Sequence, residues 1–107
     1  MKTFKTPLIS EELKYEFFKV GTQDDVSDPI IIAKFFNPSG AETWYAIAYN
    51  ENENICFGYV TGFEYDELGY FSIDELESLS LPPFGLGIER DLYFSSCPLS
   101  EITGKPS

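Results

Sequence analysis

The sequence predicts an α+β fold in which an N-terminal helix packs on an antiparallel sheet of four to five strands, with a second short helix after the fourth strand. Three observations support it. Apolar residues recur at helical spacing near the N-terminus, β-branched and aromatic runs fill the middle of the chain, and a capping motif follows the fourth run. A chain of 107 residues, 43% of them hydrophobic, can fill one core, so we expect a single domain over residues 1–107.

The first predicted element is a helix from Glu11 to Val20. Ser10 is of the residue type that caps helix N-termini, and Leu13 and Phe17 lie on one helical face. We expect this apolar stripe to form one side of the core. Residues 22–29 follow; they are polar and acidic and contain a proline, which predicts a solvated loop.

Strands are predicted wherever β-branched and aromatic residues run between turn residues. They cover residues 30–36, 43–49, 55–61, 68–71 and 89–94. The second of these is apolar on both faces and should be central in the sheet. Strict alternation would place Tyr45, Ile47 and Tyr49 on one face, and Trp44, Ala46 and Ala48 on the other.

Two features follow within and after these strands. Gly58, in the third strand, predicts a bulge or a gap filled by a neighbouring aromatic ring. Ser72 and Glu75 form a capping box that opens a helix over residues 73–79. In this helix Ile73, Leu76 and Leu79 should be buried, and residues 98–102 should make one further helical turn.

The charge of the chain is strongly negative and unevenly distributed. There are 18 Asp and Glu, 7 Lys and Arg and no His, giving a net charge of −11. Residues 35–89 contain ten carboxylates and no base. Such a charge opposes contact with nucleic-acid or lipid phosphates and favours basic partners. Arg90, which ends this segment, is expected to neutralise neighbouring carboxylates.

The residue inventory argues against an enzyme. Without histidine, the usual activation of a serine or cysteine nucleophile is missing, and no phosphate-loop or dinucleotide spacing occurs. We therefore expect neither catalysis nor a cofactor. Cys56 and Cys97 are expected to be buried, reduced thiols, and the absence of an apolar run or signal-peptide pattern predicts a cytoplasmic protein.

The candidate site is a partner-binding surface in which acidic and aromatic residues alternate. Its carboxylates could imitate phosphates toward a basic groove, and its tyrosines could serve as anchors, with Tyr59 as a further candidate. The residues are Glu64, Tyr65, Asp66, Glu67, Tyr70, Asp74, Glu75 and Glu77. Two alternatives remain open: an ordinary solvated surface, or a divalent-cation site formed by Glu64, Asp66, Glu67 and Asp74.

Several segments resemble one bacterial family, described as domain of unknown function 2958. They are TWYA (43–46), FGYVTG (57–62), DELGYFSIDELE (66–77), PFGL (83–86), IERDLYF (88–94) and PLSEI (98–102). Gly87 departs from this pattern, where a proline is expected. The resemblance implies a small acidic protein carried on plasmids, phages and integrative elements, with no settled activity or catalytic residues.

That setting implies an inhibitor of host defence, of the anti-CRISPR or anti-restriction type, that binds a CRISPR effector or restriction enzyme as a DNA mimic. A structural accessory of conjugation or phage assembly is the other role that the setting allows.

Overall fold

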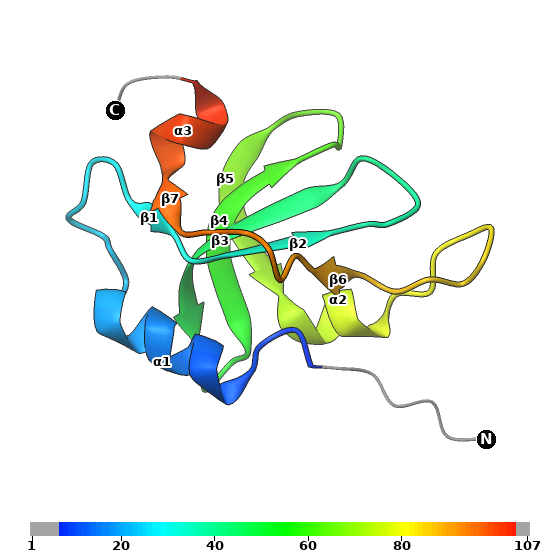
Figure 1. Ribbon diagram of the computed structural model, residues 1–107, viewed down its shortest axis with the longest axis horizontal. Coiled ribbons are helices and arrows are strands. Elements are labelled where there is room, and N and C mark those ends of the chain that lie inside the picture. Colours follow the sequence, from blue (N-terminus) through cyan, green and yellow to red (C-terminus); the bar gives the residue numbers. More distant parts are fainter. Residues whose placement is uncertain (1–6, 105–107) are drawn as a thin grey trace.

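The structure is a computed structural model that describes residues 7–104 (Figure 1). A five-stranded antiparallel sheet has the order β5-β4-β3-β2-β6, and β1 pairs with β7 in a separate two-stranded ladder. The elements are α1 (Glu11–Val20), β1 (Ile30–Ile31), β2 (Ala33–Phe36), β3 (Thr43–Asn50), β4 (Ile55–Thr61), β5 (Glu67–Ser72), α2 (Ile73–Ser78), β6 (Glu89–Arg90), β7 (Cys97–Pro98) and α3 (Leu99–Thr103). The predicted α+β fold is confirmed.

Helix α1 has the predicted bounds and caps. The Ser10 hydroxyl accepts a hydrogen bond from the Leu13 backbone N–H at 3.1 Å, and the Gly21 N–H donates to the Phe17 carbonyl. Leu13 and Phe17 are buried against the sheet. No helix within residues 7–104 is long and apolar enough to span a membrane.

The core lies on one face of the five-stranded sheet, beneath α1 and α2. Its members come from both helices, from the central strands and from the segment before β6. They are Leu8, Ile9, Leu13, Phe17, Ile32, Ala33, Phe35, Trp44, Ala46, Cys56, Ile73, Leu76 and Ile88. Neither α1 nor α2, the two helices that contribute to this core, covers the opposite face of the sheet, which we call the outer face.

A bulge in β3 corrects the predicted alternation. Ala46 pairs with Gly58 and Ala48 with Phe57, so Ile47 is an extra residue in the ladder. The strand is central as predicted, but its faces exchange at this point. Tyr49 packs on Phe17 on the core face, 5.6 Å between ring centroids, whereas strict alternation had placed it with Tyr45.

Gly58 has a different role from the two that its sequence position suggested. The bulge lies on the neighbouring strand, and the atoms nearest to a Cβ built on Gly58 belong to the backbone of Tyr45 and Ala46. A Cβ atom there would collide with the Tyr45 backbone carbonyl. The position therefore needs glycine because the bulged β3 backbone approaches it closely.

The other strand boundaries also show corrections. The predicted strand 30–36 divides at Ile32, whose N–H donates to the Ala46 carbonyl at 2.8 Å. The predicted strand 89–94 pairs only through Glu89 and Arg90, because the chain then turns across the outer face toward β7. Leu79 was predicted to be buried but is exposed at the C-terminal cap of α2.

Residues 22–29 are not simply a solvated loop. The Gln23 side-chain amide donates to the carbonyls of Ile30 and Ile47, at 2.9 and 2.8 Å, and accepts from the Ile30 N–H at 2.7 Å. The Asp28 carboxylate accepts from the N–H and the hydroxyl of Ser100 in α3. Asp24 and Asp25 are exposed, as expected.

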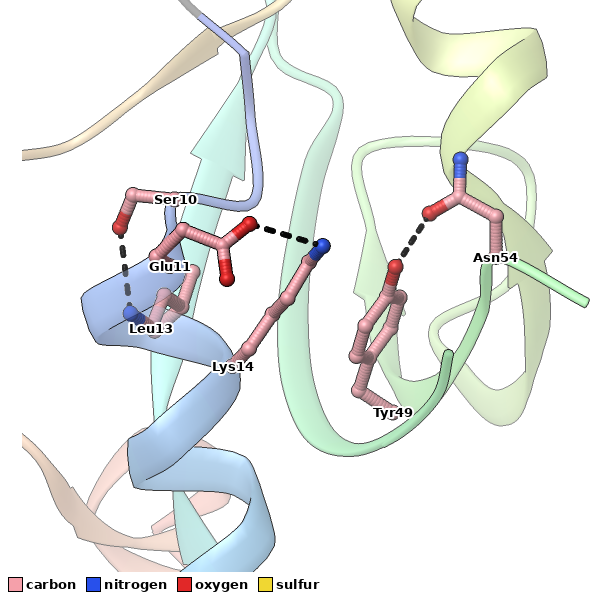
Figure 2. A network of polar contacts seen from close by, with 6 residues as sticks. All are labelled: Ser10, Glu11, Leu13, Lys14, Tyr49 and Asn54. Carbon is pink, nitrogen blue, oxygen red and sulfur yellow. Dashed lines mark hydrogen bonds and ion pairs between the residues drawn. The ribbon is translucent and has the colours of Figure 1, made fainter. Parts of the chain in front are cut away.

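The turn between β3 and β4 holds the start of α2. Figure 2 shows the Ser10 cap and the Glu11–Lys14 ion pair of α1 beside Tyr49, whose hydroxyl donates to Asn54 Oδ1 at 2.6 Å. The Asn54 amide in turn donates to Asp74 Oδ1 at 2.8 Å. Ser72 caps α2 as predicted, with its hydroxyl accepting from the Glu75 N–H. Asn54 thus links β3 to the start of α2.

Both cysteines are free, but their environments differ. Burial raises the pKa of the Cys56 thiol to about 12. Cys97 is only half-buried, contrary to the expectation that both thiols are buried, and burial raises its pKa, with a further contribution from Glu101.

Candidate functional site

Five carboxylates are spread along the end of the sheet that the β2–β3 and β4–β5 turns form, from Glu67 on edge strand β5 to Glu89 on the opposite edge strand β6. Figure 1 shows these two turns at the same end of the sheet, opposite to α1 and α2. The turns touch, because a Cβ atom on Gly62 would collide with the Ala41 carbonyl, and Glu89 pairs with Phe36 beside them. We call this set the acidic end. It consists of Glu42, Glu64, Asp66, Glu67 and Glu89.

The cations within residues 7–104 are used elsewhere. The three ion pairs there join Lys14 to Glu11, Lys19 to Glu16 and Lys34 to Asp91. None of these pairs includes a carboxylate of the acidic end. The negative charge of this end is therefore not offset by a direct cation contact from the described part of the chain.

The sequence predicted that Arg90 neutralises neighbouring carboxylates. Within residues 7–104 it forms no ion pair with one. It pairs with Phe35 in the β2–β6 ladder, which directs its side chain toward the start of α1. Its Nη1 donates to the Ser10 hydroxyl at 3.4 Å. Glu89, the preceding residue, projects to the opposite face of the strand.

The eight residues predicted as a partner-binding surface do not form one patch. Glu64, Tyr65, Asp66 and Glu67 lie together at the acidic end, all exposed. Tyr70 lies in the middle of β5, on the outer face. The α2 carboxylates are at the other end of β5, about 17 Å away for five strand residues. The sequence pattern therefore combined two groups that the strand separates.

The α2 carboxylates have local contacts. Asp74 and Glu75 are exposed, and Asp74 accepts the hydrogen bond from Asn54. Glu77 is half-buried, and its Oε2 accepts from the Leu8 N–H at 2.9 Å. Glu77 therefore holds the segment before α1 and is a weaker candidate for contact with a partner.

Glu42 and Glu89 belong to the acidic end, but the sequence pattern did not predict them as residues of the candidate site. They are 47 positions apart; the contact between the two turns places Glu42 at this end of the sheet, and strand pairing places Glu89 there. Glu42 accepts from the Asn37 side-chain amide at 2.8 Å, which fixes its carboxylate beside the turn. The signal that could have found them is the register of β2 with β3 and β6.

The outer face beside the acidic end is aromatic. One row crosses four strands, with Lys34, Tyr45, Tyr59 and Leu68 in register. The next row pairs Phe57 with Tyr70, whose rings meet edge to face at 5.0 Å.

Only part of the outer face is covered. Phe94 from the segment before β7 packs on Tyr45, 6.3 Å between centroids, and burial raises the pKa of the Tyr45 hydroxyl. Leu68 and Tyr70 on β5 remain 49% and 79% exposed. The open part of this face thus lies over β4 and β5.

The structure does not assemble the cation site that was the alternative. Asp74 lies at the far end of β5 from Glu64, Asp66 and Glu67. Within residues 7–104, no group of three or more His, Cys, Asp or Glu side chains is arranged to hold a metal ion.

A hollow of about 950 Å³ lies between the segment before α1 and β6. Leu8 and Ile88 line it together with Arg90, Glu12 and Glu77. Ser10 supplies the one hydroxyl among the described residues that line it, and this hydroxyl already accepts hydrogen bonds from the Leu13 N–H and from Arg90.

Residues 8–103 match the family model described as Protein of unknown function (DUF2958). The chain belongs to this family. The match to DUF2958 includes every element from α1 to α3, which confirms the resemblance drawn from the sequence motifs. No curated protein and no solved structure matches the chain.

Proposed function

We propose that this DUF2958 protein is a non-enzymatic inhibitor that binds a basic nucleic-acid-binding surface of a defence protein through its acidic end. Glu64, Asp66 and Glu67 take the place of phosphates, and Tyr65 provides an aromatic anchor. The target is a CRISPR effector or restriction enzyme, if the mobile-element setting that the family resemblance implied applies to this chain. The carrying observation is that the five carboxylates along this end of the sheet make no ion pair with a described cation.

Physical arguments support this proposal. Carboxylates at one end of the molecule without local cations create a negative potential that steers a positively charged surface toward them. Exposed tyrosine beside them is of the type enriched at interfaces. Basic grooves that bind nucleic acid are complementary to such a surface, because they are built to neutralise closely spaced phosphates.

A defence assay tests the proposal directly. The protein is expressed in bacteria that carry a restriction system or a CRISPR system, and the plating of a targeted phage is measured. We expect plating to rise with the wild-type protein and to return to the defended level with the triple variant E64Q/D66N/E67Q. These substitutions keep side-chain size and remove three charges, so the fold should remain intact.

A matched control separates position from total charge. The triple variant E12Q/D24N/D25N removes three exposed charges from α1 and the following loop. It should inhibit defence as well as the wild type. Equal loss of inhibition in both triple variants would assign the effect to net charge and refute the acidic end as the site. No rise in plating in any defended strain would refute the inhibitor role.

Salt dependence provides a second measurement with purified components. If the acidic end competes with DNA for a basic groove, added protein should displace labelled DNA from the target enzyme, and rising salt should weaken the displacement. Inhibition without displacement of DNA would show that the protein acts away from the groove.

A further inference from the structure

Strand β5 forms a long unpaired edge of the sheet. Within residues 7–104 it pairs only with β4, through Glu67–Ser72, while the opposite edge is the two-residue strand β6. An edge strand presents a row of free backbone N–H and C=O groups on its outer side. At about 3.4 Å per residue, this row is about 20 Å long.

Apart from the charge of Glu67 at its start, the edge lacks the devices that usually protect such strands. Soluble proteins place lysine, proline or a bulge on exposed edges to prevent pairing with another chain. The sequence ELGYFS of β5 contains no lysine or proline, and its register with β4 is regular. Gly69, in the middle of the strand, has no side chain, and nothing lies within 4 Å of where its Cβ atom would be.

Side chains on β5 offer an apolar contact next to this edge. Leu68 and Tyr70 lie on the outer face and are largely exposed, and the Tyr70 ring is held edge to face against Phe57. In strand addition, backbone hydrogen bonds supply affinity and alternate side chains supply specificity. A strand added to β5 would place every second side chain beside these two residues.

Electrostatics decides between a second copy of this chain and a different partner. Two copies of β5 in antiparallel pairing would bring Glu67 and the acidic turn before it beside Asp74 and Glu75 of the second copy. This juxtaposes like charges at both ends of the new ladder, which opposes self-pairing. The same carboxylates favour a strand that carries cationic residues at both ends.

We propose that β5 accepts an extended segment of a partner protein as a sixth strand. The segment has apolar β-branched or aromatic residues against Leu68 and Tyr70, and lysine or arginine residues at both ends. This inference deepens the proposed function, since it rests on a basic partner and states how that partner is held.

The test uses a defined peptide and the full-length protein labelled with ¹⁵N. The peptide RRVTVTVRR has a strand-forming core and cationic ends. One control peptide replaces its arginines by glutamates, and another carries N-methyl groups on every core amide, which removes the donors of both strand edges. Amide chemical shifts are followed during titration with each peptide.

We expect the arginine peptide to shift the amides of residues 67–72. N-methylation should weaken binding by about 30-fold, because two to three backbone hydrogen bonds are lost. The glutamate peptide should cause no shifts. On the protein, Tyr70→Thr should weaken binding of the arginine peptide, whereas Tyr15→Thr, an equally large change on the exposed side of α1, should not.

Each contrary outcome overturns a defined part of the inference. Equal binding of the N-methylated peptide would show that charge alone holds the partner and would exclude strand addition, while leaving the proposed function standing. Absence of shifts in residues 67–72 with the arginine peptide would refute the docking site. Concentration-dependent shifts in β5 without peptide, with a dimer in light scattering, would identify a second copy as the occupant. The phage-plating assay judges the inhibitor role independently.

Discussion

Replacing Gln23 by alanine should destabilise the protein strongly, although the residue lies in a polar loop. Its side-chain amide bridges two parts of the chain, with donors to the carbonyls of Ile30 and Ile47 and an acceptor for the Ile30 N–H, all at 2.9 Å or less. Ile47 is the extra residue of the β3 bulge. The Gln23 amide therefore hydrogen-bonds the Ile47 carbonyl at the point where the β3–β4 ladder is interrupted.

The magnitude follows from these three hydrogen bonds. A net contribution of about 1 kcal/mol each gives about 3 kcal/mol, and orphaned backbone groups with restricted access to water raise the cost further. Gln23 also has a positive φ of 58°, a left-handed conformation that alanine would keep without the compensating contacts. We expect a loss of about 3 to 4 kcal/mol in the free energy of unfolding.

Denaturant titration followed by tryptophan fluorescence measures this loss, since Trp44 is buried in the core. Asp25→Ala, an exposed change in the same loop, is the matched control and should lie within about 0.5 kcal/mol of wild type. Gln23→Glu provides a further test. It keeps the shape but places a carboxylate oxygen against two carbonyls, so it should be as harmful as alanine at neutral pH and partly recover in acid.

Wild-type stability of Gln23→Glu at neutral pH would refute this reasoning. It would mean that the amide donors contribute nothing and that the loop is held by other contacts. A loss in Asp25→Ala equal to that of Gln23→Ala would show instead that the whole loop, and not the amide bridge, is sensitive to substitution.

Three further predictions use other parts of the fold. Gly58→Ala should cost about 2 kcal/mol or more in denaturant titration, because its Cβ collides with backbone, whereas the paired Gly69→Ala should be nearly neutral; equal effects would contradict the close approach. Asn54→Ala should cost about 1 to 2 kcal/mol through the lost bonds to Tyr49 and Asp74, and unchanged thermal stability would show that these bonds are replaced by water. The folded-state pKa of Cys56 is raised from 9.0 to about 12, so its contribution to stability is complete below pH 9 and is lost as pH rises through that interval. The unfolding free energy should fall by up to about 1.4 kcal/mol per pH unit there, and Cys56→Ala should show a shallower fall.

The parts of the fold that depend on neighbouring residues in the chain were predictable. Ser10 and Gly21 bound α1, and Ser72 opens α2, because capping residues act within one helical turn. The central position of β3 followed from its apolar faces. Each of these signals is local, and the structure confirms each one.

The errors concern features that depend on contacts between distant segments. The β3 bulge is stabilised by Gln23, which lies more than twenty positions earlier, and nothing within β3 itself announces an extra residue at Ile47. Arg90 was assigned to carboxylates because of its isolation in the sequence, but its ladder position directs it to Ser10. Strand register determined both outcomes, and register was not readable from the separate strands.

The candidate site was predictable only in part, for the same reason. The run from Glu64 to Glu77 is dense in carboxylates, and the sequence treated it as one surface. A strand of six residues divides it, since β5 carries the two groups to opposite ends of the sheet. The sequence did not predict Glu42 and Glu89 as members of the acidic end, because turn contacts and strand pairing, and not nearness in the sequence, place them there.

The placement of charge argues against solubility as the whole explanation for the acidity of this chain. Solubility requires net charge, and charge spread over the surface would provide it while limiting self-repulsion. Here Lys14 and Lys19 pair with glutamates of their own helix and Lys34 pairs with Asp91. The acidic end is left without such a pair inside residues 7–104, although pairing there would reduce repulsion. Unpaired charge at one end of the sheet is what the proposed binding role requires, and the neighbouring free edge and exposed tyrosine of β5 would give the proposed partner further groups to contact.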